Sequence, residues 1–316
     1  MTTASRSING AGSSEPFAAR TGELKLHAGD PAPAGGAGYR LVELAGGVRS
    51  VHSCAYAETF HPVVGPVAEA QALYVKQLRL PERMRAQREF VLWDVGLGAA
   101  ANPLAVLRAT RELDCLVRLV SFDQTVAALQ FALVHADALG YLSGYEGELE
   151  QLASHRHASF RDGSREVHWD LHVADFPTLL TQPAAARLPK PHAIMFDAFS
   201  PARNPAMWTA PLFQRLFGLL DPARPCALPT YSRSTMLRVT LLLAGFFVGV
   251  GHATGEKEET TIAANSLALI PEPLERSWLQ RARRSSSAEP LWEPTYRQAP
   301  LTRQTWDRLN EHPQFR

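Results

Sequence analysis

Two apolar runs in this 316-residue chain lead into residues that could do chemistry together. Residues 193–196 (Ala-Ile-Met-Phe) run into Asp197, and residues 90–95 run into the turn Gly96-Leu97-Gly98. In open α/β sheets, ligands bind at the carboxyl ends of the strands, where the strand order reverses. A carboxylate there can orient an attacking group and accept its proton, and glycines let the backbone approach a ligand closely. The two runs therefore predict an enzyme that acts through a nucleoside cofactor.

Two further carboxylates favour the same kind of site. Asp123 ends the next apolar run, 25 positions after Gly98, which is near the spacing of an acid that hydrogen-bonds a ribose diol. Asp175 follows residues 171–174 and is placed to face an adenine amine. Either acid could instead be a plain surface residue. Ala101 stands where a dinucleotide-binding turn needs its third glycine, which favours S-adenosylmethionine, a cofactor without phosphates.

Strands that alternate with helices from residue 90 onward predict a parallel sheet that would position these residues. The expected strands are 90–95, 116–122, 193–196 and 226–231, and the expected helices are 103–111, 125–138, one from about 211, and 234–244. The runs 158–161 and 166–173 flank a turn signal and predict a hairpin. The runs 245–250 and 260–269 predict a closing antiparallel pair. Upstream, we expect a hairpin over 39–51, a loop over 58–66 and a helix over 67–78.

The bulk composition excludes several classes of protein. Hydrophobic residues make up 46% and charged residues 20%, which is typical of globular proteins. The net charge of +1 gives no global basic field, although the arginines at 281, 283 and 284 could form a local phosphate-binding patch or a solvated face. Three distant cysteines predict reduced thiols. No histidine spacing suggests a metal, and the longest apolar run (239–251) is too short to span a bilayer. We expect a cytoplasmic protein without metal or membrane association.

Two motifs carry a resemblance to a known family. Asp94-Val95-Gly96-Leu97-Gly98-Ala99-Ala100-Ala101-Asn102-Pro103-Leu104 resembles the cofactor loop of the methyltransferase domain of the tRNA 5-methylaminomethyl-2-thiouridine biosynthesis bifunctional proteins. Residues 197–208 (Asp-Ala-Phe-Ser-Pro-Ala-Arg-Asn-Pro-Ala-Met-Trp) resemble that family's acid-Gly-Phe-Ala-Pro-Ala-Lys-Asn-Pro-Asp-Met-Trp box. Weaker similarity at Glu58-Thr59, in the 155–163 segment and at Thr230-Tyr231-Ser232 extends the resemblance over roughly residues 40–270.

The resemblance implies an α/β, class I S-adenosylmethionine-dependent methyltransferase (Rossmann-like) fold, with an N-terminal β-hairpin extension and an irregular C-terminal arm. It implies methylation of the exocyclic amine of 5-aminomethyl-2-thiouridine at the tRNA wobble position. We expect a disordered tail (1–38), a hairpin and helix extension (39–84), the methyltransferase domain (85–270) and a peripheral C-terminal arm (271–316). A separate oxidase would supply the aminomethyl uridine, because the segment after 270 is too short for the family's flavin-dependent oxidase domain. No obligate protein partner is evident.

The same resemblance assigns roles to residues. Asp197 is expected to be catalytic. The expected cofactor-binding residues are Gly96, Gly98, Asn102, Asp123, Asp175 and Glu58, and the expected substrate-binding residues are Phe199, Pro201, Arg203 and Tyr231. Phe199 and Tyr231 would stack on a flipped base, and Arg203 would contact phosphate.

Alanines replace glycines of the family at positions 100 and 198, and two other functions therefore stay open. One is an aminopropyltransferase resembling spermidine synthase, which shares the fold. The other is a methyltransferase-fold protein that binds RNA or a partner without turnover.

Overall fold

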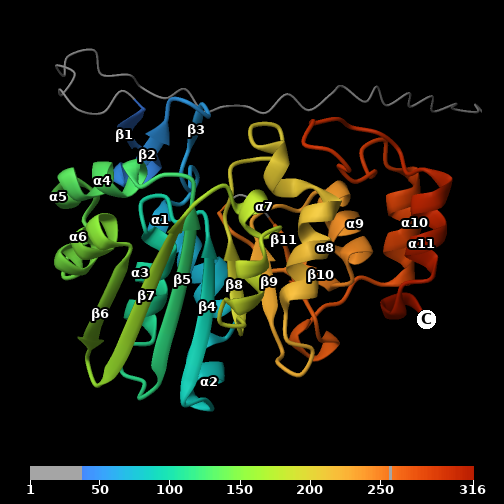
Figure 1. The fold of residues 1–316 in the computed structure, drawn as a ribbon. Coiled ribbons are helices and arrows are strands. Elements are labelled where there is room, and N and C mark those ends of the chain that lie inside the picture. The colour runs from blue at the N-terminus through green and yellow to red at the C-terminus, as the bar shows by residue number, and fades with distance from the viewer. Residues whose placement is uncertain (1–37, 256–257) are drawn as a thin grey trace, which may run out of the picture. The chain divides into compact units, whose positions relative to one another are not determined.

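The computed structural model describes residues 38–255 and 258–316, which are built around an eight-stranded sheet (Figure 1). In lateral order the strands are β10 (Phe247–Gly251), β11 (Thr260–Ala264), β9 (Ala227–Thr230), β8 (Ala193–Phe196), β4 (Glu89–Val95), β5 (Leu116–Asp123), β7 (Arg165–Val173) and β6 (His157–Asp162). Strands β9, β8, β4, β5 and β7 run parallel to one another. Strands β6 and β11 run antiparallel to their neighbours. The expected parallel sheet, the hairpin near Gly163 and the closing antiparallel pair are confirmed.

The strand order reverses between β4 and β8. The chain leaves β4 for β5 and β7 on one side, and returns to β8 and β9 on the other. The carboxyl ends of β4 and β8 are therefore neighbours, because Val95 lies opposite Phe196 in the register. Such a switch point is where open α/β sheets bind ligands. It brings the glycine turn and Asp197 together, as the sequence predicted.

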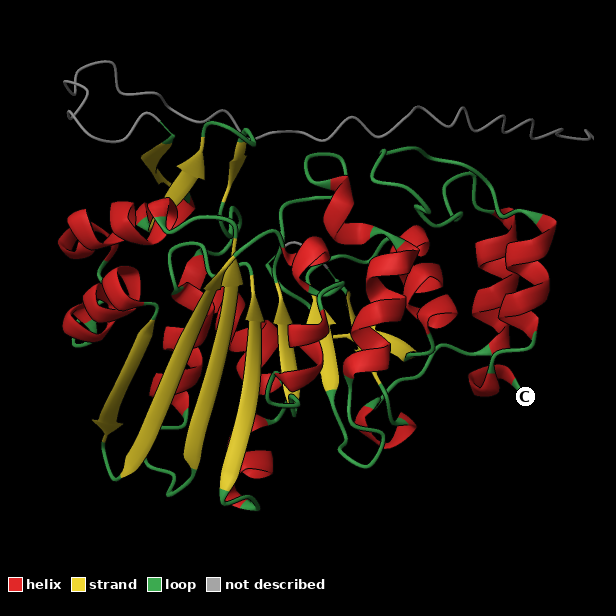
Figure 2. Cartoon of the chain, in the orientation of Figure 1, coloured by secondary structure: helices red, strands yellow, loops and turns green. Residues whose placement is uncertain are grey.

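Helices cover both faces of the sheet (Figure 2). Along β4, Phe90 and Leu92 belong to one buried cluster, while Val91 and Trp93 belong to the other. Because successive side chains of a strand point to opposite faces, β4 is buried on both sides, which explains its unbroken apolar run. The first cluster includes residues of α3 (Ala101–Ala109), α4 (Ala127–Val134), α5 (Ala136–Leu139) and α6 (Glu146–His155), and the second includes residues of α7 (Phe176–Leu179), α8 (Ala210–Leu219) and α9 (Thr235–Ala244). The helix expected over 125–138 is thus two helices.

The N-terminal extension forms a second, three-stranded sheet. Strand β1 (Tyr39–Glu43) pairs antiparallel with β2 (Arg49–Ser53), which confirms the hairpin, and Gly46 and Gly47 turn the chain at φ +83° and +78°. Strand β3 (Glu58–Thr59) pairs with β2, so the start of the expected 58–66 loop is a strand. The expected helix over 67–78 is α1 (Pro66–Ala70) continued by the π-type turns of η2 (Gln71–Lys76), and α2 (Leu80–Arg85) follows. The tail expected over 1–38 lies almost wholly outside the described residues.

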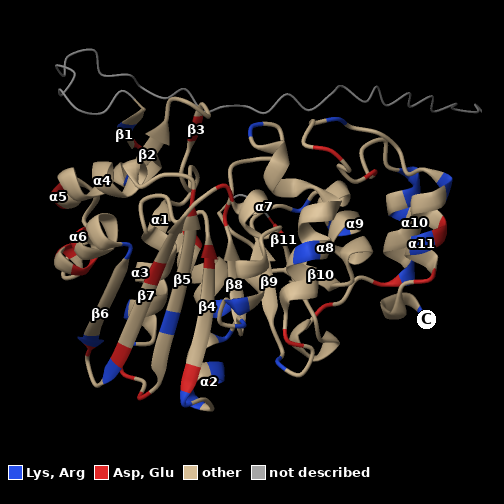
Figure 3. Cartoon of the chain, in the orientation of Figure 1, with Lys and Arg blue, Asp and Glu red and all other residues tan. Residues whose placement is uncertain are grey.

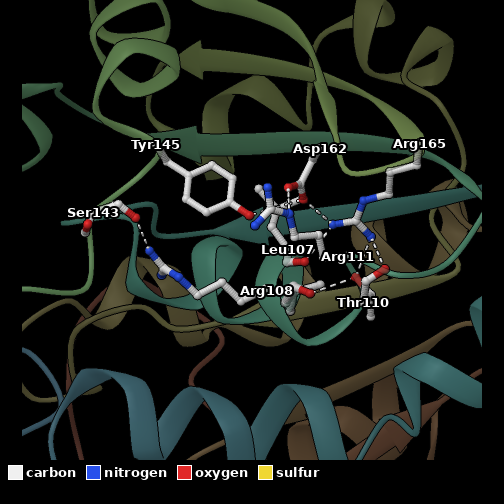
Figure 4. Close-up of polar contacts among 9 residues, drawn as sticks. Leu107, Arg108, Thr110, Arg111, Ser143, Tyr145, Asp162 and Arg165 are labelled. Carbon is white, nitrogen blue, oxygen red and sulfur yellow. Dashed lines mark hydrogen bonds and ion pairs between the residues drawn. The ribbon is translucent and has the colours of Figure 1, made fainter.

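A buried arginine ties the β6–β7 hairpin to the end of α3 (Figure 4). The Arg165 guanidinium donates to the carbonyls of Thr110 and Leu107 at 2.7 and 2.6 Å, and to Asp162 Oδ2 at 2.7 Å. Tyr145 also donates to Asp162, and burial, followed by the charge of Asp162, raises the pKa of Tyr145 to about 12. The network therefore links the β6–β7 hairpin and Tyr145 to the end of α3.

The C-terminal arm is more regular than we expected. It contains the helices α10 (Arg276–Arg284) and α11 (Arg303–Asn310). Trp278, Leu279 and Ala282 of α10 are buried, whereas most of its other positions are polar, so its apolar stripe is too narrow for sequence periodicity to reveal. The Arg283 guanidinium lies 4.9 Å from the centroid of the Trp306 ring and joins the two helices. Acidic residues are interspersed with the arginines of this arm (Figure 3).

Three further expectations concern cysteines, membranes and metals. Cys54, Cys115 and Cys226 are all free thiols, and burial raises the pKa of Cys226 to about 12. Within 38–255 and 258–316, no helix is long and apolar enough to cross a membrane. No cluster of three or more potential metal ligands occurs in the same residues.

Candidate active site

The turn after β4 requires both of its glycines. Gly96 has φ +94°, and a Cβ there would lie 2.6 Å from the carbonyl oxygen of Asp197. Gly98 has φ +52°, and its Cβ would lie 3.1 Å from the Phe60 ring of the extension. Only glycine allows these approaches without displacing backbone or an aromatic ring. The turn is therefore enclosed by the β8 loop on one side and by the extension on the other.

Ala100 stands where the family that the sequence resembles has a glycine, and its backbone conformation shows the consequence. It adopts φ +63° immediately before α3 and is fully buried. A left-handed conformation costs a residue with a Cβ roughly 1–2 kcal/mol. The alanine thus occupies a backbone conformation that suits glycine. The turn keeps this conformation although it is strained for a residue with a Cβ.

Asp123 supports the glycine turn from the end of β5. Its Oδ2 accepts a hydrogen bond from the Gly98 amide at 2.9 Å, and its Oδ1 accepts one from the Thr125 amide at 3.2 Å. Burial raises the pKa of Asp123, and its backbone hydrogen bonds oppose that shift. The structure thus places this carboxylate at the turn; its contact with a ribose diol remains a prediction.

Asp175 also lies beyond a strand end, but its carboxylate already caps a helix. Its Oδ2 accepts from the amide and the hydroxyl of Thr178 at 3.0 and 2.6 Å, at the first turn of α7. Its Oδ1 accepts from Gln124 Nε2 at 3.0 Å. Burial tends to raise the pKa of Asp175, but these hydrogen bonds outweigh it and lower the pKa. Contact with adenine remains a prediction for this residue.

Asp197 follows β8 and lies over the amino end of α3. Its amide donates to the carbonyl of Val95 at 3.0 Å, which holds it beside the glycine turn. Its Oδ2 accepts from Asn102 Nδ2 at 2.8 Å. Asn102 was expected to contact the cofactor; the structure shows that its amide orients Asp197. With one oxygen held in this way, Oδ1 is the atom of Asp197 left for a substrate.

The loop after Asp197 is fixed by the extension and by β9. Glu58 accepts from the amide of Ser200 at 3.0 Å and also from its hydroxyl. Tyr231 donates to the carbonyl of Ala198 at 3.0 Å. Glu58 and Tyr231, expected to bind cofactor and base, are thus both seen to hold the 198–200 backbone. Trp208, further along the same loop, is fully buried.

An aromatic cluster lies on the outer side of this loop. The Phe199 ring stacks on Tyr56 with centroids 4.1 Å apart and an interplanar angle of 17°, and Phe60 lies 5.6 Å from it. The Tyr56 hydroxyl donates to Gln124 Oε1 at 3.2 Å. Pro201 is half-buried and Arg203 is exposed at the next turn. Sequence reasoning did not single out Tyr56, because it lies in the extension, far along the chain from the 197–208 box.

Sequence reasoning also missed a histidine and a glutamate beside Asp197. His61 Nε2 lies 3.6 Å from Asp197 Oδ2, and His61 Nδ1 lies 3.9 Å from Glu69 Oε2. The side chains of His61 and Glu69 are each 9% exposed. Tyr74 faces the same space, and burial, then Asp197 and Glu69, raises its pKa well above the usual value. In this segment of the sequence, only Glu58-Thr59 indicated a functional role. No spacing pattern indicated that His61 and Glu69 would lie close together.

The polar atoms beneath the turn suit a cationic ligand. Asp94 Oδ1 and Asn102 Oδ1 are buried and have no hydrogen-bond partner among the described residues. Burial raises the pKa of Asp94 to about 7, and the negative charges of Asp197 and Asp123 at this edge add to that shift. Buried acceptors without partners are costly unless a donor reaches them. S-adenosylmethionine carries a sulfonium and an ammonium, so these residues fit it.

Comparisons with known proteins agree with this geometry. A family model described as S-adenosyl-L-methionine-dependent methyltransferase matches residues 147–266. The tRNA 5-methylaminomethyl-2-thiouridine biosynthesis bifunctional protein MnmC of Ralstonia nicotianae is 30% identical over 252 residues, which are 76% of this chain and 35% of that protein. The protein of the same name from Cupriavidus metallidurans is 30% identical over 67% of this chain and 32% of its own length. This chain therefore spans about a third of the curated relatives it matches.

A solved structure gives the same picture of the fold. The crystal structure of MNMC2 from Aquifex aeolicus aligns with a TM-score of 0.64 at 20% identity, and covers 88% of this chain and 86% of that one. At that identity the likeness shows the fold, which is the class I methyltransferase fold expected from the sequence.

Proposed function

We propose, from the premise that this chain carries an MnmC-like S-adenosylmethionine-dependent methyltransferase domain, that it methylates the exocyclic amine of 5-aminomethyl-2-thiouridine at the tRNA wobble position. One observation carries the proposal most directly. Asp197 lies at the switch point of the sheet, beside the glycine turn, with Oδ2 held by Asn102. A fixed carboxylate next to the cofactor turn is what an amine needs in order to be aligned and deprotonated.

Methyl transfer to an amine requires little covalent catalysis by the protein. An alkylammonium has a pKa of about 10, like that of lysine, so it must lose a proton before its lone pair can attack. Asp197 Oδ1 would accept a hydrogen bond from the amine, orient it and draw off the proton. When bound, S-adenosylmethionine would supply the electrophilic methyl group that the amine attacks. Gly96 and Gly98 let the backbone approach the cofactor, and Asp123 holds the turn in place.

The aromatic cluster supports a nucleobase substrate. The Phe199 and Tyr56 pair would present a flat apolar face on which a flipped base could stack. Arg203, which is exposed beside this pair, would contact phosphate. The finer roles of Pro201 and Tyr231 toward the base belong to the same proposal. We propose that a separate oxidase supplies the aminomethyl uridine, and that the reaction takes place in the cytoplasm.

The test is single-turnover methyl transfer from labelled cofactor to undermethylated tRNA. Asp197→Asn keeps the shape of the side chain but cannot take up a proton, so we expect a rate loss of about 100- to 10,000-fold, the usual range for a general base. Cofactor affinity, measured by calorimetry, should change little. Asp114→Asn is the matched control, because Asp114 is exposed ahead of β5, at the amino end of the sheet.

Two results would contradict the proposal in different ways. Equal rates for wild type and Asp197→Asn would remove Asp197 from the mechanism. No transfer by the wild type to any tRNA, with cofactor bound, would remove tRNA as the substrate.

A further inference from the structure

His61 lies between two carboxylates at the centre of the candidate site. Its Nε2 faces Asp197 Oδ2 at 3.6 Å and its Nδ1 faces Glu69 Oε2 at 3.9 Å. The three side chains come from different parts of the chain: the loop after β3, the β8 loop, and α1. One ring nitrogen lies toward each carboxylate, so a single imidazole stands between Asp197 and Glu69.

The backbone around His61 is held in place on both sides. His61 itself has φ +48°, a conformation that is uncommon for a residue with a side chain. Before it, the Phe60 amide donates to the carbonyl of Val51 at 2.8 Å. After it, Gly65 turns at φ +85°, and a Cβ there would lie 2.6 Å from Val48. Strain of this kind persists only where the surroundings impose it.

The charges that face His61 are mostly negative. Glu69 faces it from α1 and Asp197 from the β8 loop. The other titratable groups there are the hydroxyls of Tyr74 and Tyr231, and burial followed by the charge of Asp197 raises the pKa of both, so they stay neutral. His61 therefore lies next to both acids, and Asp197 also accepts a hydrogen bond from Asn102.

We propose that His61, which lies beside Glu69, is a positioning residue that orients Asp197 and takes up the proton which Asp197 receives from the substrate amine. The inference rests on the proposed methylation of an amine. In that reaction the nitrogen lone pair forms the bond to the methyl carbon, and the carbon–sulfur bond breaks with its electron pair returning to sulfur. The proton lost by nitrogen goes to Asp197 Oδ1; the carboxyl group then turns about its Cβ–Cγ bond, which brings the protonated oxygen to the side that faces His61, and the proton passes to Nε2. Proton release to solvent from the ring then completes the turnover, and Glu69 stabilises the ring while it is protonated.

The direction of this relay follows from turnover, because the Asp197 carboxylate must lose the amine proton before it can accept another. His61 is the ring that lies beside this carboxylate. Glu69 plays the part of the acid that orients a histidine in hydrolytic triads, where the carboxylate fixes the ring and stabilises its protonated form.

The first experiment uses variants chosen for the left-handed backbone of His61. His61→Asn suits the positive φ because asparagine is enriched there, and His61→Gly leaves a space for free imidazole. We expect His61→Asn to lower the single-turnover rate about 100-fold near neutral pH, with cofactor affinity unchanged. The loss should shrink as pH rises toward the amine pKa, and added imidazole should restore much of the rate to His61→Gly. His52→Asn is the control, since His52 lies in the same extension but its ring bonds Thr59 at 2.9 Å.

Two activity results would overturn the relay. A rate loss in His61→Asn that is equal at every pH, and no response of His61→Gly to imidazole, would each mean that the ring serves only the shape of the loop.

The second experiment needs no substrate. Nitrogen NMR of the histidine rings reports which nitrogens carry protons, and we expect both Glu69→Gln and Asp197→Asn to change the protonation of the His61 ring at fixed pH. The His52 ring should not respond. A His61 ring that responds to neither variant overturns the relay, whatever the methyl acceptor is. A ring that responds, in a protein that methylates no tRNA, supports the coupling of the three groups and refutes the proposed function.

Discussion

Replacing Asp94 by asparagine should remove much of the pH dependence of folding stability. The Asp94 side chain is fully buried at the end of β4. Its Oδ2 accepts from the Ser121 hydroxyl at 2.8 Å, while Oδ1 has no partner among the described residues. Burial raises the pKa of Asp94 from 3.8 to about 7; the Ser121 bond opposes this shift, and the charges of Asp197 and Asp123 add to it.

The sign and size follow from proton linkage. Between pH 3.8 and about 7 the folded protein keeps a proton on Asp94 that the unfolded chain has released. The free energy of unfolding therefore falls as pH rises through this window, and the contribution present below it is lost above it. A shift of about 3 units corresponds to about 4 kcal/mol, at 1.36 kcal/mol per unit. About 3 kcal/mol of this falls between pH ~4.5 and ~8.5.

Asparagine isolates the effect because it cannot ionise. Its carbonyl can still accept from Ser121, and its NH₂ replaces the O–H donor of the protonated acid. Urea unfolding of wild type and Asp94→Asn at several pH values between about 4.5 and 8.5 gives the difference directly, since all other titrating groups are shared. We expect Asp94→Asn to gain about 3 kcal/mol relative to wild type across that range. The exposed Asp114→Asn should show no such trend. A constant difference between Asp94→Asn and wild type, within about 1 kcal/mol, would refute the reasoning.

Two further substitutions test the cofactor turn. Ala100→Gly relieves the strain of φ +63° but gives up a buried methyl, worth about 0.8 kcal/mol, so thermal unfolding should show a net change within about 1 kcal/mol; a loss above ~2 kcal/mol would mean that the methyl packs without strain. Asp123→Ala should weaken S-adenosylmethionine binding by roughly 1–3 kcal/mol in calorimetry, the scale of a lost buried hydrogen-bond partner. Unchanged affinity in Asp123→Ala would show that this carboxylate serves only the Gly98 amide.

The sheet and its switch point could be predicted because their signals are local. Strands β4 and β8 are buried on both faces, so their residues form short apolar runs, and each run ends in a glycine turn or an acid. The C-terminal helices could not be predicted in this way. In α10 only a narrow stripe around Trp278 and Leu279 is apolar, and its stability depends on a surface supplied by distant residues.

The residues of the candidate site likewise differ in whether local sequence signals locate them. Asp197, Gly96 and Asp123 follow from strand ends, which sequence patterns locate. The positions of Asn102 and Glu58 were anticipated, but their contacts with Asp197 and Ser200 depend on packing between elements. His61 and Glu69 meet only because the loop turns at Gly65, and no periodicity records that turn.

The bond between Glu58 and Ser200 also sets an order of events during protein synthesis. The two residues are 142 positions apart, so the extension leaves the ribosome long before its partner exists. At 5–20 residues per second the delay is roughly 7–30 seconds. An isolated hairpin is marginally stable in water, and the extension can pack on Phe131 of α4 before β8 is made, but its bond to Ser200 must wait until β8 and its loop have emerged. The loop that carries Asp197 is therefore fixed on this side by a segment that was synthesised long before it.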